Sequence, residues 1–164
     1  MNDKTALILS PHCDDEVIGT YRVLSRYEKL VIIYDQNNEE SRRKEAIEKL
    51  PKIVTNVKQL FLSTIPGEFQ NNNYRIFAPD PFFEIHPLHR KWGTEAEQLA
   101  RKGLDVVFYT TLMNTPYISE VDRPEDKKLV LDFVYESQKS LWTFDHKFFL
   151  FEGYSKWIFN PEFL

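Results

Sequence analysis

Apolar and polar residues follow one another in a regular order along most of this chain. Four short runs rich in Val, Ile and Leu have the length of buried β-strands: 6–9, 30–34, 59–62 and 106–110. Three stretches between them carry apolar residues at helical spacing: 17–27, 41–50 and 92–102. Short strands that alternate with helices indicate parallel strands joined by helical crossovers. We therefore expect a layered α/β fold with a mostly parallel sheet.

The same spacing predicts which side of each helix is buried. Asp14 or Asp15 is placed to cap the free N–H groups of the first helix, and Pro51 is expected to end the second. The faces expected inside are Val17, Ile18, Tyr21, Leu24 and Tyr27 in the first helix, Ala46, Ile47 and Leu50 in the second, and Ala96, Leu99 and Ala100 in the third.

The remaining segments have less regular patterns. Residues 63–81 are rich in Pro, Gly and Asn and predict a long loop. Because four aromatic residues lie in or just after it, this loop is either a binding rim or a loop pinned to the core. The other expected segments are a loop over 114–124, one long helix over 125–141 with Val130, Phe133, Val134 and Leu141 on one face, and an irregular strand over 148–159.

Composition narrows the class of protein. A chain of 164 residues with 42% hydrophobic and 28% charged residues is typical of one globular domain, here 1–164. A net charge of −4 without a basic run argues against a nucleic-acid partner. The single cysteine, the lack of a signal-peptide pattern and the lack of a membrane-spanning run together favour a soluble, cytoplasmic protein.

The first polar cluster follows the opening strand directly. Ser10 and Pro11 stop the apolar run, and His12, Asp14, Asp15 and Glu16 come next, where a helix begins. A histidine and three acids between a strand and a helix have the layout of a site at the carboxyl edge of a parallel sheet.

Two pairs of residues have the spacing of metal ligands. His12 and Asp15 are three residues apart, and so are His86 and His89, so each pair can point the same way from one turn. Two imidazoles and one carboxylate leave an open position for water, as in catalytic zinc sites, although the same set also suits non-haem iron. Pro87 stiffens the second segment.

Simpler interpretations of the same residues stay open. Three acids at a helix start are common as plain helix caps, and a His-x-x-His pair is often a surface or core feature. Cys13 is a further candidate ligand or reactive thiol, and His146 is expected to be structural.

The adjacent acids suggest a division of roles. If Asp15 holds a metal, Asp14 is left beside it as a general base. A metal-bound water has its pKa lowered from about 15.7 towards 7, so a carboxylate can take its proton at neutral pH. Hydrolysis of an amide or ester would follow, with a nearby histidine stabilising the oxyanion or protonating the leaving amine.

The two clusters also resemble a known family. Residues 10–19, Ser-Pro-His-Cys-Asp-Asp-Glu-Val-Ile-Gly, are similar to the opening His-Pro-Asp-Asp-Glu motif of the LmbE-like, or PIG-L, superfamily of zinc-dependent de-N-acetylases. Residues 86–90, His-Pro-Leu-His-Arg, are similar to its second motif, His-x-Asp-His. Weaker similarities follow in the family's order at 106–109, 117–122, 135–138 and Glu152.

The resemblance implies a Rossmann-like three-layer fold with the metal site at the carboxyl ends of the strands. It implies a zinc ion, or another divalent metal, on His12, Asp15 and His89, with Asp14 as general base and His86 as electrophilic or acid partner. Arg42 is the nearest match to an arginine that helps to hold substrate. The implied activity is removal of an acetyl group from a small N-acetylated molecule, such as an N-acetylglucosamine derivative; a homo-oligomer is possible.

Three departures from the family pattern bear on activity. Cys13 replaces a proline, Thr20 replaces a second glycine, and Leu88 stands where an aspartate is common. In the family that aspartate would orient a catalytic histidine, a role that Glu84 could take over here. The alternative is a relative of weak or no activity that acts as a metal-containing sugar-binding module. A nucleotide-binding α/β domain is disfavoured, because no Gly-x-Gly-x-x-Gly follows a strand.

Overall fold

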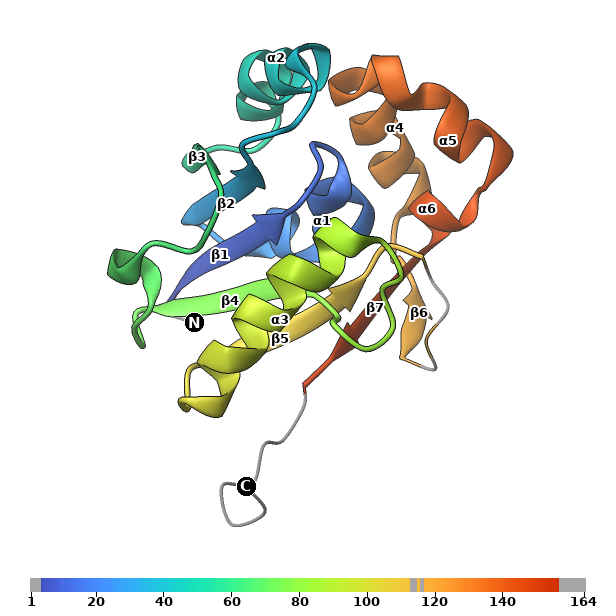
Figure 1. The fold of residues 1–164 in the computed structure, drawn as a ribbon. Helices are drawn as coiled ribbons and strands as arrows, with labels where there is room; N and C mark the ends of the chain where they lie inside the picture. The colour runs from blue at the N-terminus through green and yellow to red at the C-terminus, as the bar shows by residue number, and fades with distance from the viewer. Residues whose placement is uncertain (1–3, 113–114, 116, 157–164) are drawn as a thin grey trace.

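The structure is a computed structural model that describes residues 4–112, 115 and 117–156. Its centre is a seven-stranded sheet in the order β3-β2-β1-β4-β5-β7-β6 (Figure 1). The strands are β1 (Thr5–Ser10), β2 (Leu30–Asp35), β3 (Val57–Leu62), β4 (Tyr74–Pro79), β5 (Val106–Thr110), β6 (Ile118–Glu120) and β7 (Phe151–Ser155). The first five are parallel, and β7 runs antiparallel to β5 and β6.

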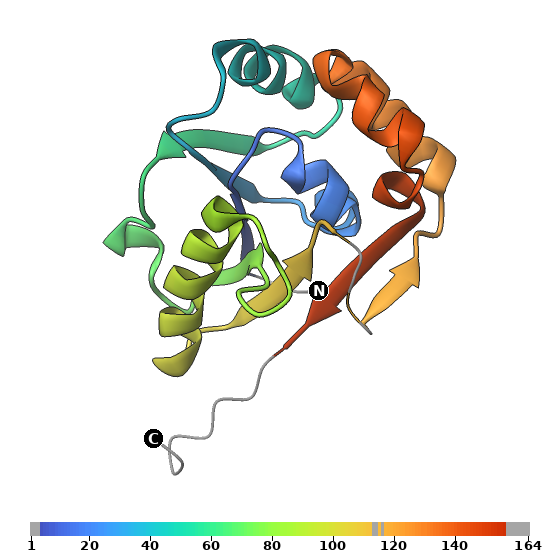
Figure 2. The same cartoon turned by 45° about the vertical axis from the view of Figure 1, so that its right-hand side comes forward.

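Helices cover both faces of this sheet, which confirms the Rossmann-like three-layer fold (Figures 1 and 2). One face carries α3 (Pro87–Arg101), and Phe69 packs on it as well. The other carries α1 (Asp15–Arg26), α2 (Glu40–Lys49), α4 (Pro124–Val134), α5 (Lys139–Phe144) and α6 (Lys147–Leu150). Short 3-10 turns lie at Leu50–Lys52, Gly67–Phe69 and Glu136–Gln138. No helix of the described ranges is long and apolar enough to cross a membrane.

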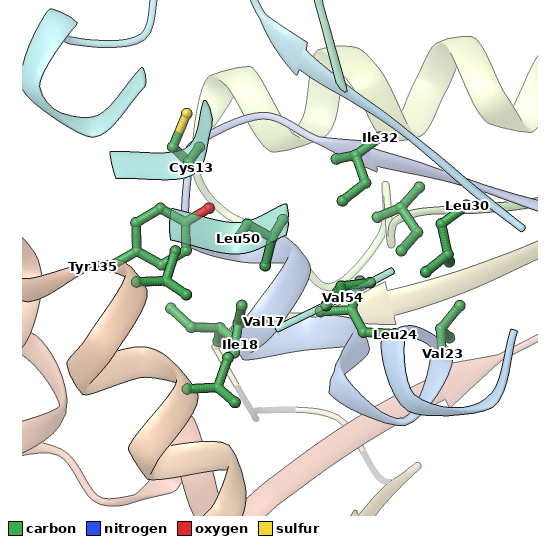
Figure 3. Close-up of a cluster of buried hydrophobic side chains, with 14 of the residues drawn as sticks. Cys13, Val17, Ile18, Val23, Leu24, Leu30, Ile32, Leu50, Val54 and Tyr135 are labelled. Atoms are coloured by element: carbon green, nitrogen blue, oxygen red, sulfur yellow. The ribbon is translucent and has the colours of Figure 1, made fainter. Parts of the chain in front are cut away.

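Strand alternation divides the core into two clusters. In β1, Ala6 and Ile8 face α1, whereas Leu7 and Leu9 face α3, and all four are fully buried. Figure 3 shows part of the larger cluster, in which α1 residues meet Leu50, Val54 and Tyr135. Burial on both faces explains why β1, β2 and β5 appear as continuous apolar runs in the sequence.

The strand order creates one special position at the carboxyl edge of the sheet, between β1 and β4. The chain runs from β1 through α1 to β2 in one direction across the sheet, and from β4 through α3 to β5 in the other. The carboxyl ends of the neighbouring strands β1 and β4 therefore flank a topological switch point, where ligands bind in open α/β sheets. The segments with His12 and with His86 and His89 both begin there.

The predicted long loop over 63–81 is wrong, because a central strand lies inside it. Residues Tyr74–Pro79 form β4, which pairs with β1 and β5. Two aromatic residues assigned to the loop, Tyr74 and Phe77, are strand residues, and Phe77 is 5% exposed. Turn-forming residues are dense on both sides of β4, and the strand itself ends at Pro79. The strand could therefore be recognised only from its pairing with β1 and β5.

The single helix predicted over 125–141 is also wrong. Helix α4 ends at Val134, because Tyr135 leaves helical geometry (φ −112°, ψ 53°) and its hydroxyl donates to the buried carboxylate of Glu16. A second helix, α5, starts at Lys139. As a result Phe133 and Leu141 are 47% and 44% exposed, not buried on one face.

Other boundaries differ in smaller ways. Ile47, expected inside, is 51% exposed, and the loop predicted over 114–124 contains the short strand β6. Helix α3 begins at Pro87, five residues before the predicted start, since proline is favoured in a first helical turn. The strand predicted over 148–159 is confirmed only over Phe151–Ser155, which is β7, because 148–150 belong to helix α6. Residues 157–159 and Asn114 lie outside the described residues.

One ion-pair network near the start of β5 gives a testable prediction. Asp105 accepts hydrogen bonds from Lys4, Arg75 and Lys156. Burial alone would raise the pKa of this carboxyl, but its three cations hold the pKa below the usual value. A depressed folded-state pKa adds stability that is present above the unfolded pKa of about 3.9 and is lost as the pH falls below it.

Asp105→Asn is therefore expected to lower the free energy of unfolding at pH 7 by about 1 kcal/mol. The loss should shrink as the pH falls below about 4, because the carboxyl of the unfolded chain is then protonated, which offsets the stability that the ionised carboxylate gives to the folded protein. Urea unfolding at pH 7 and pH 3 measures both values. A deficit that is equal at the two pH values would contradict the prediction.

Candidate metal centre

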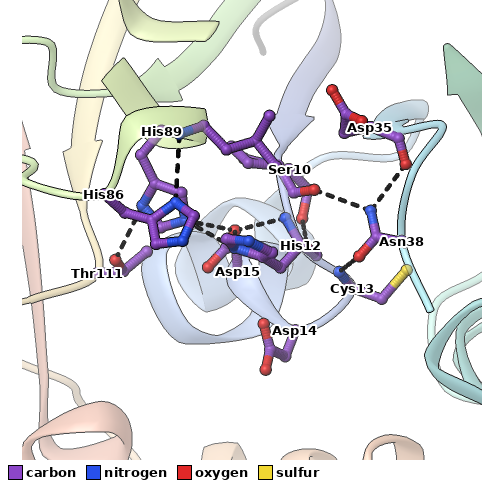
Figure 4. Close-up of polar contacts among 12 residues, drawn as sticks. Ser10, His12, Cys13, Asp14, Asp15, Asp35, Asn38, His86, His89 and Thr111 are labelled. Carbon is purple, nitrogen blue, oxygen red and sulfur yellow. Dashed lines mark hydrogen bonds and ion pairs between the residues drawn. The ribbon is translucent and has the colours of Figure 1, made fainter. Parts of the chain in front are cut away.

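Three predicted ligands meet at the switch point. The Nδ1 atom of His12 lies 2.9 Å from Nε2 of His89, and the Oδ2 atom of Asp15 lies 3.3 Å from the first and 3.0 Å from the second. Figure 4 shows this ligand triangle, His12–Asp15–His89, with the His86 ring beside it. Residues from β1–α1 and from α3 are thus brought together across 77 positions of sequence.

The ligand triangle has the dimensions of a metal coordination sphere. Ligands held about 2.0–2.1 Å from a tetrahedral zinc ion lie about 3.3 Å from one another, close to the three observed distances of 2.9, 3.0 and 3.3 Å. The histidine set His12, His86 and His89 could also hold an ion, but its ligand atoms are held only within 4.8 Å of one another. We favour the ligand triangle, whose atoms are closer together and which also supplies one negative charge. The residues present therefore fit a divalent metal.

A buried carboxylate fixes the orientation of His89. Nδ1 of His89 donates to Oε2 of Glu84 at 2.9 Å, and Glu84 also accepts from the backbone N–H and the hydroxyl of Thr111. With Nδ1 protonated, Nε2 of a neutral His89 presents its lone pair to the ligand triangle. Glu84 therefore orients the ring of His89. Gly93 lets α3 approach, since a Cβ there would lie 2.4 Å from the Pro79 carbonyl oxygen.

The loop that bears His12 is held by two polar side chains, the partly buried Asn38 and the buried Glu16. Asn38 accepts the Cys13 N–H at 2.8 Å and donates to the carbonyl oxygens of Pro11 and Asp35, each at 2.8 Å (Figure 4). Glu16, fully buried, accepts from Ser10, from the Asp14 N–H and from Tyr135. Glu16, which had no predicted role, thus fixes the turn between β1 and α1.

The charges of the ligand triangle depend strongly on one another. Burial would raise the pKa of Asp15, but the charge of His89 and hydrogen bonds from His12 and His89 hold it below its usual value. Burial would lower the pKa of His89, whereas Asp15 and Glu84 raise it to about 10. The metal-free site therefore holds a proton on His89. A divalent cation would replace that proton.

His86 lies at the exposed side of the centre. Its ring is 4.7 Å from that of His12 and 5.2 Å from that of His89. Burial and the charges of His12 and His89 lower its pKa, so it is neutral at pH 7. Its Nδ1 accepts the Leu88 N–H at the start of α3, which leaves Nε2 as the protonated nitrogen and a hydrogen-bond donor.

Asp14 is buried, but it is not part of the ligand triangle. It precedes α1 at φ 141°, and its side chain makes no capping hydrogen bond, so the predicted cap is wrong. Figure 4 draws no contact between its carboxylate and the imidazoles. Burial, together with the charges of Asp15 and Glu16, raises its pKa well above the usual value. Such a carboxyl group binds protons readily.

The other candidate residues take different positions. Cys13 is fully buried, and burial raises the pKa of its thiol far above the usual range, so it is a core residue and not a reactive thiol. The charge of Arg42 acts on both Cys13 and Asp14, and its buried Nε has no hydrogen-bond partner. His146 is exposed beside Phe149, far along the chain from the centre.

Glu84→Gln tests the orienting role directly. Gln can accept from Thr111 but cannot match the negative charge that Nδ1–H of His89 contacts. Loss of such a partner typically weakens metal binding about 10- to 100-fold, and we expect that loss in a zinc competition titration. The matched control is Glu97→Gln, in an exposed ion pair with Arg101 on α3, the helix that carries His89. Equal affinity in the two variants would show that Glu84 does not orient His89.

Sequence reasoning missed Asn38 and Thr111. Both stand next to the carboxyl ends of predicted strands, Asn38 three residues after β2 and Thr111 directly after β5. A search for polar residues at those ends would have found them.

Comparisons with known proteins support the fold. No family model and no curated protein matches this chain. Among solved structures, the crystal structure of the conserved protein TT1542 from Thermus thermophilus is similar over 96% of this chain and 98% of that chain. The TM-score is 0.58 and the sequence identity 16%, so the similarity extends to the fold alone. Fold and site together define a Rossmann-like α/β protein with a candidate metal centre at its switch point.

Proposed function

We propose that this protein is a zinc-dependent N-deacetylase that releases acetate from a small N-acetylated molecule, such as an N-acetylglucosamine derivative. One observation carries the proposal: the two-imidazole, one-carboxylate ligand triangle at the switch point. The resemblance of residues 10–19 and 86–90 to the LmbE-like motifs supplies the reaction class. A cytoplasmic location, in keeping with the single buried Cys13, is part of the proposal.

His12, Asp15 and His89 would hold the metal, which supplies Lewis-acid polarisation of the acetyl carbonyl and acidifies water. Asp14 would accept a proton from the attacking water and pass it to the leaving amine, so that acetate and a free amine result. The Nε2–H of His86 would donate to the carbonyl oxygen as negative charge develops there. Arg42, whose charge acts on Asp14 and whose Nε has an ion pair with Glu39 at 3.6 Å but no hydrogen bond, would hold substrate.

A test uses the full chain loaded with zinc and a panel of N-acetylated sugars, with free amine as the readout. We expect amine release from at least one N-acetylglucosamine derivative and its loss after chelation. If a sugar binds without amine release, the protein is the non-catalytic sugar-binding module. If the purified chain binds no divalent metal, the metal centre and the activity are both excluded.

A further inference from the structure

A hollow lies on the α1 side of the sheet, at the opposite end of the strands from the metal centre. Its floor is formed by Phe77 of β4, Val107 of β5 and Tyr154 of β7, and its volume is about 260 Å³. Phe77 and Val107 are paired residues of neighbouring strands. The rim contains Arg22 and Arg26 from the last turns of α1 and Arg75 near the start of β4. We call this the arginine hollow.

The floor of the arginine hollow is an apolar surface that α1 leaves partly open. Val107 and Tyr154 are only partly buried, although they pack against the core on this face. The rings of Tyr27 and Tyr154 meet Phe77 edge-on, with centroids 5.8 and 6.5 Å away. Apolar walls with a few polar groups at the rim are the usual construction of a small-molecule site.

The rim is positively charged, and none of the described residues that line it is acidic. The buried carboxylate of Glu152 accepts from the Tyr154 hydroxyl at 2.8 Å. Arg22 is already engaged with Ser119 and Glu120 of β6. Arg26 has a long, exposed ion pair with Asp122, at 3.5 Å with both side chains more than half exposed, and such pairs contribute little. Arg26 can therefore turn to an incoming anion at little cost.

Arg75 belongs to a group with excess positive charge. It shares the carboxylate of Asp105 with Lys4 and Lys156, so three cations face one anion. Its Nη1 reaches the Tyr27 hydroxyl at a long 3.4 Å. An anion in the hollow would meet this uncompensated charge in a protein whose net charge is −4.

A neighbouring cavity provides a contrast. It has a similar volume of about 240 Å³ and shares Arg22 and Arg26, but Asp122, Arg123 and Asp126 line it as well. Its charges are nearly balanced, and Tyr21 and Val121 line it in place of Phe77, Val107 and Tyr154. The excess positive charge and the apolar floor coincide only in the arginine hollow, among the cavities described for this part of the chain.

We propose that the arginine hollow is a second binding site, for a small organic anion whose apolar body packs on Phe77, Val107 and Tyr154 while its oxyanion meets Arg26 and Arg75. The oxyanion is a carboxylate or a phosphate ester, since guanidinium groups pair with both. The site is independent of the metal centre, because its residues lie at the amino ends of β4 and β5.

The test is a two-dimensional ¹H–¹⁵N NMR titration of the zinc-loaded full chain with phenyl phosphate, with benzoate, and with neutral phenol. We expect both anions to shift the amide signals of Arg26, Tyr27, Val107 and Tyr154, and phenol to bind at least tenfold more weakly. Tighter binding of phenyl phosphate would identify a phosphate ester, and tighter binding of benzoate a carboxylate.

Four variants sharpen the test. Arg26→Gln should weaken binding about tenfold, the usual loss for one charged hydrogen bond. Val107→Glu places a negative charge in the apolar floor and should weaken binding at least as much, whereas Asp105→Asn should strengthen it. Arg101→Gln, an equal charge change on α3, is the control. The proposal is overturned if shifts occur only around His12 and His89, if Arg26→Gln and Val107→Glu bind like wild type, or if the shifts follow self-association measured by light scattering.

Discussion

His89→Ala is expected to abolish stoichiometric zinc binding. Structural zinc sites bind with about 10–16 kcal/mol from about four ligands, so one ligand accounts for about 3–4 kcal/mol, or a loss of about 10²- to 10³-fold in affinity. His89 supplies the Nε2 atom nearest to both partners in the ligand triangle. Metal content after dialysis against a weak chelator measures the effect.

The control for this prediction is His146→Ala, which removes an exposed histidine beside Phe149 that has no contact with the ligand triangle among the described interactions. His89 is 5% exposed and pairs with two buried acids, so its replacement also weakens the fold. His12→Ala, at a more exposed ligand, therefore serves as a second variant, with circular dichroism to confirm folding. Zinc retention by both folded variants would show that the ligand triangle does not hold the metal.

Replacing Asp14 is expected to separate activity from stability. Asp14→Asn should keep zinc but lose about 10²- to 10⁴-fold in the rate of amide hydrolysis, the range that a general base supplies. Amine release under single-turnover conditions, with zinc content measured on the same sample, tests this. A variant that hydrolyses at the wild-type rate would remove Asp14 from the mechanism.

Asp14→Gly should in addition raise the melting temperature. A non-glycine residue at φ 141° stores strain of about 1–3 kcal/mol, whereas glycine adds about 0.5–1 kcal/mol of freedom to the unfolded chain. The balance favours the variant by about 1 kcal/mol, and loss of a buried acid between Cys13 and Asp15 acts in the same direction. A lower melting temperature in the metal-free protein would show that the Asp14 side chain stabilises the fold.

Much of the fold follows from local patterns. Strands β1, β2 and β5 lie within one residue of their predicted bounds, because each is buried on both faces and so appears as an unbroken apolar run. Strand β4 was missed, because turn formers surround it and its burial depends on pairing with β1 and β5. The break after Val134 was missed because it depends on a hydroxyl that reaches Glu16, 119 residues away.

The candidate site was likewise predictable from the sequence only in part. Spacing of three residues places His12 with Asp15 and His86 with His89, since one turn of backbone fixes such pairs whatever the rest of the chain does. Only the strand order brings His12 within 2.9 Å of His89 and sets Glu84 and Thr111 behind it. The sequence by itself thus determined the residue types and local pairs of the centre. Only the tertiary structure brought these local pairs together and formed the arginine hollow, because contacts between distant segments depend on how the strands are ordered.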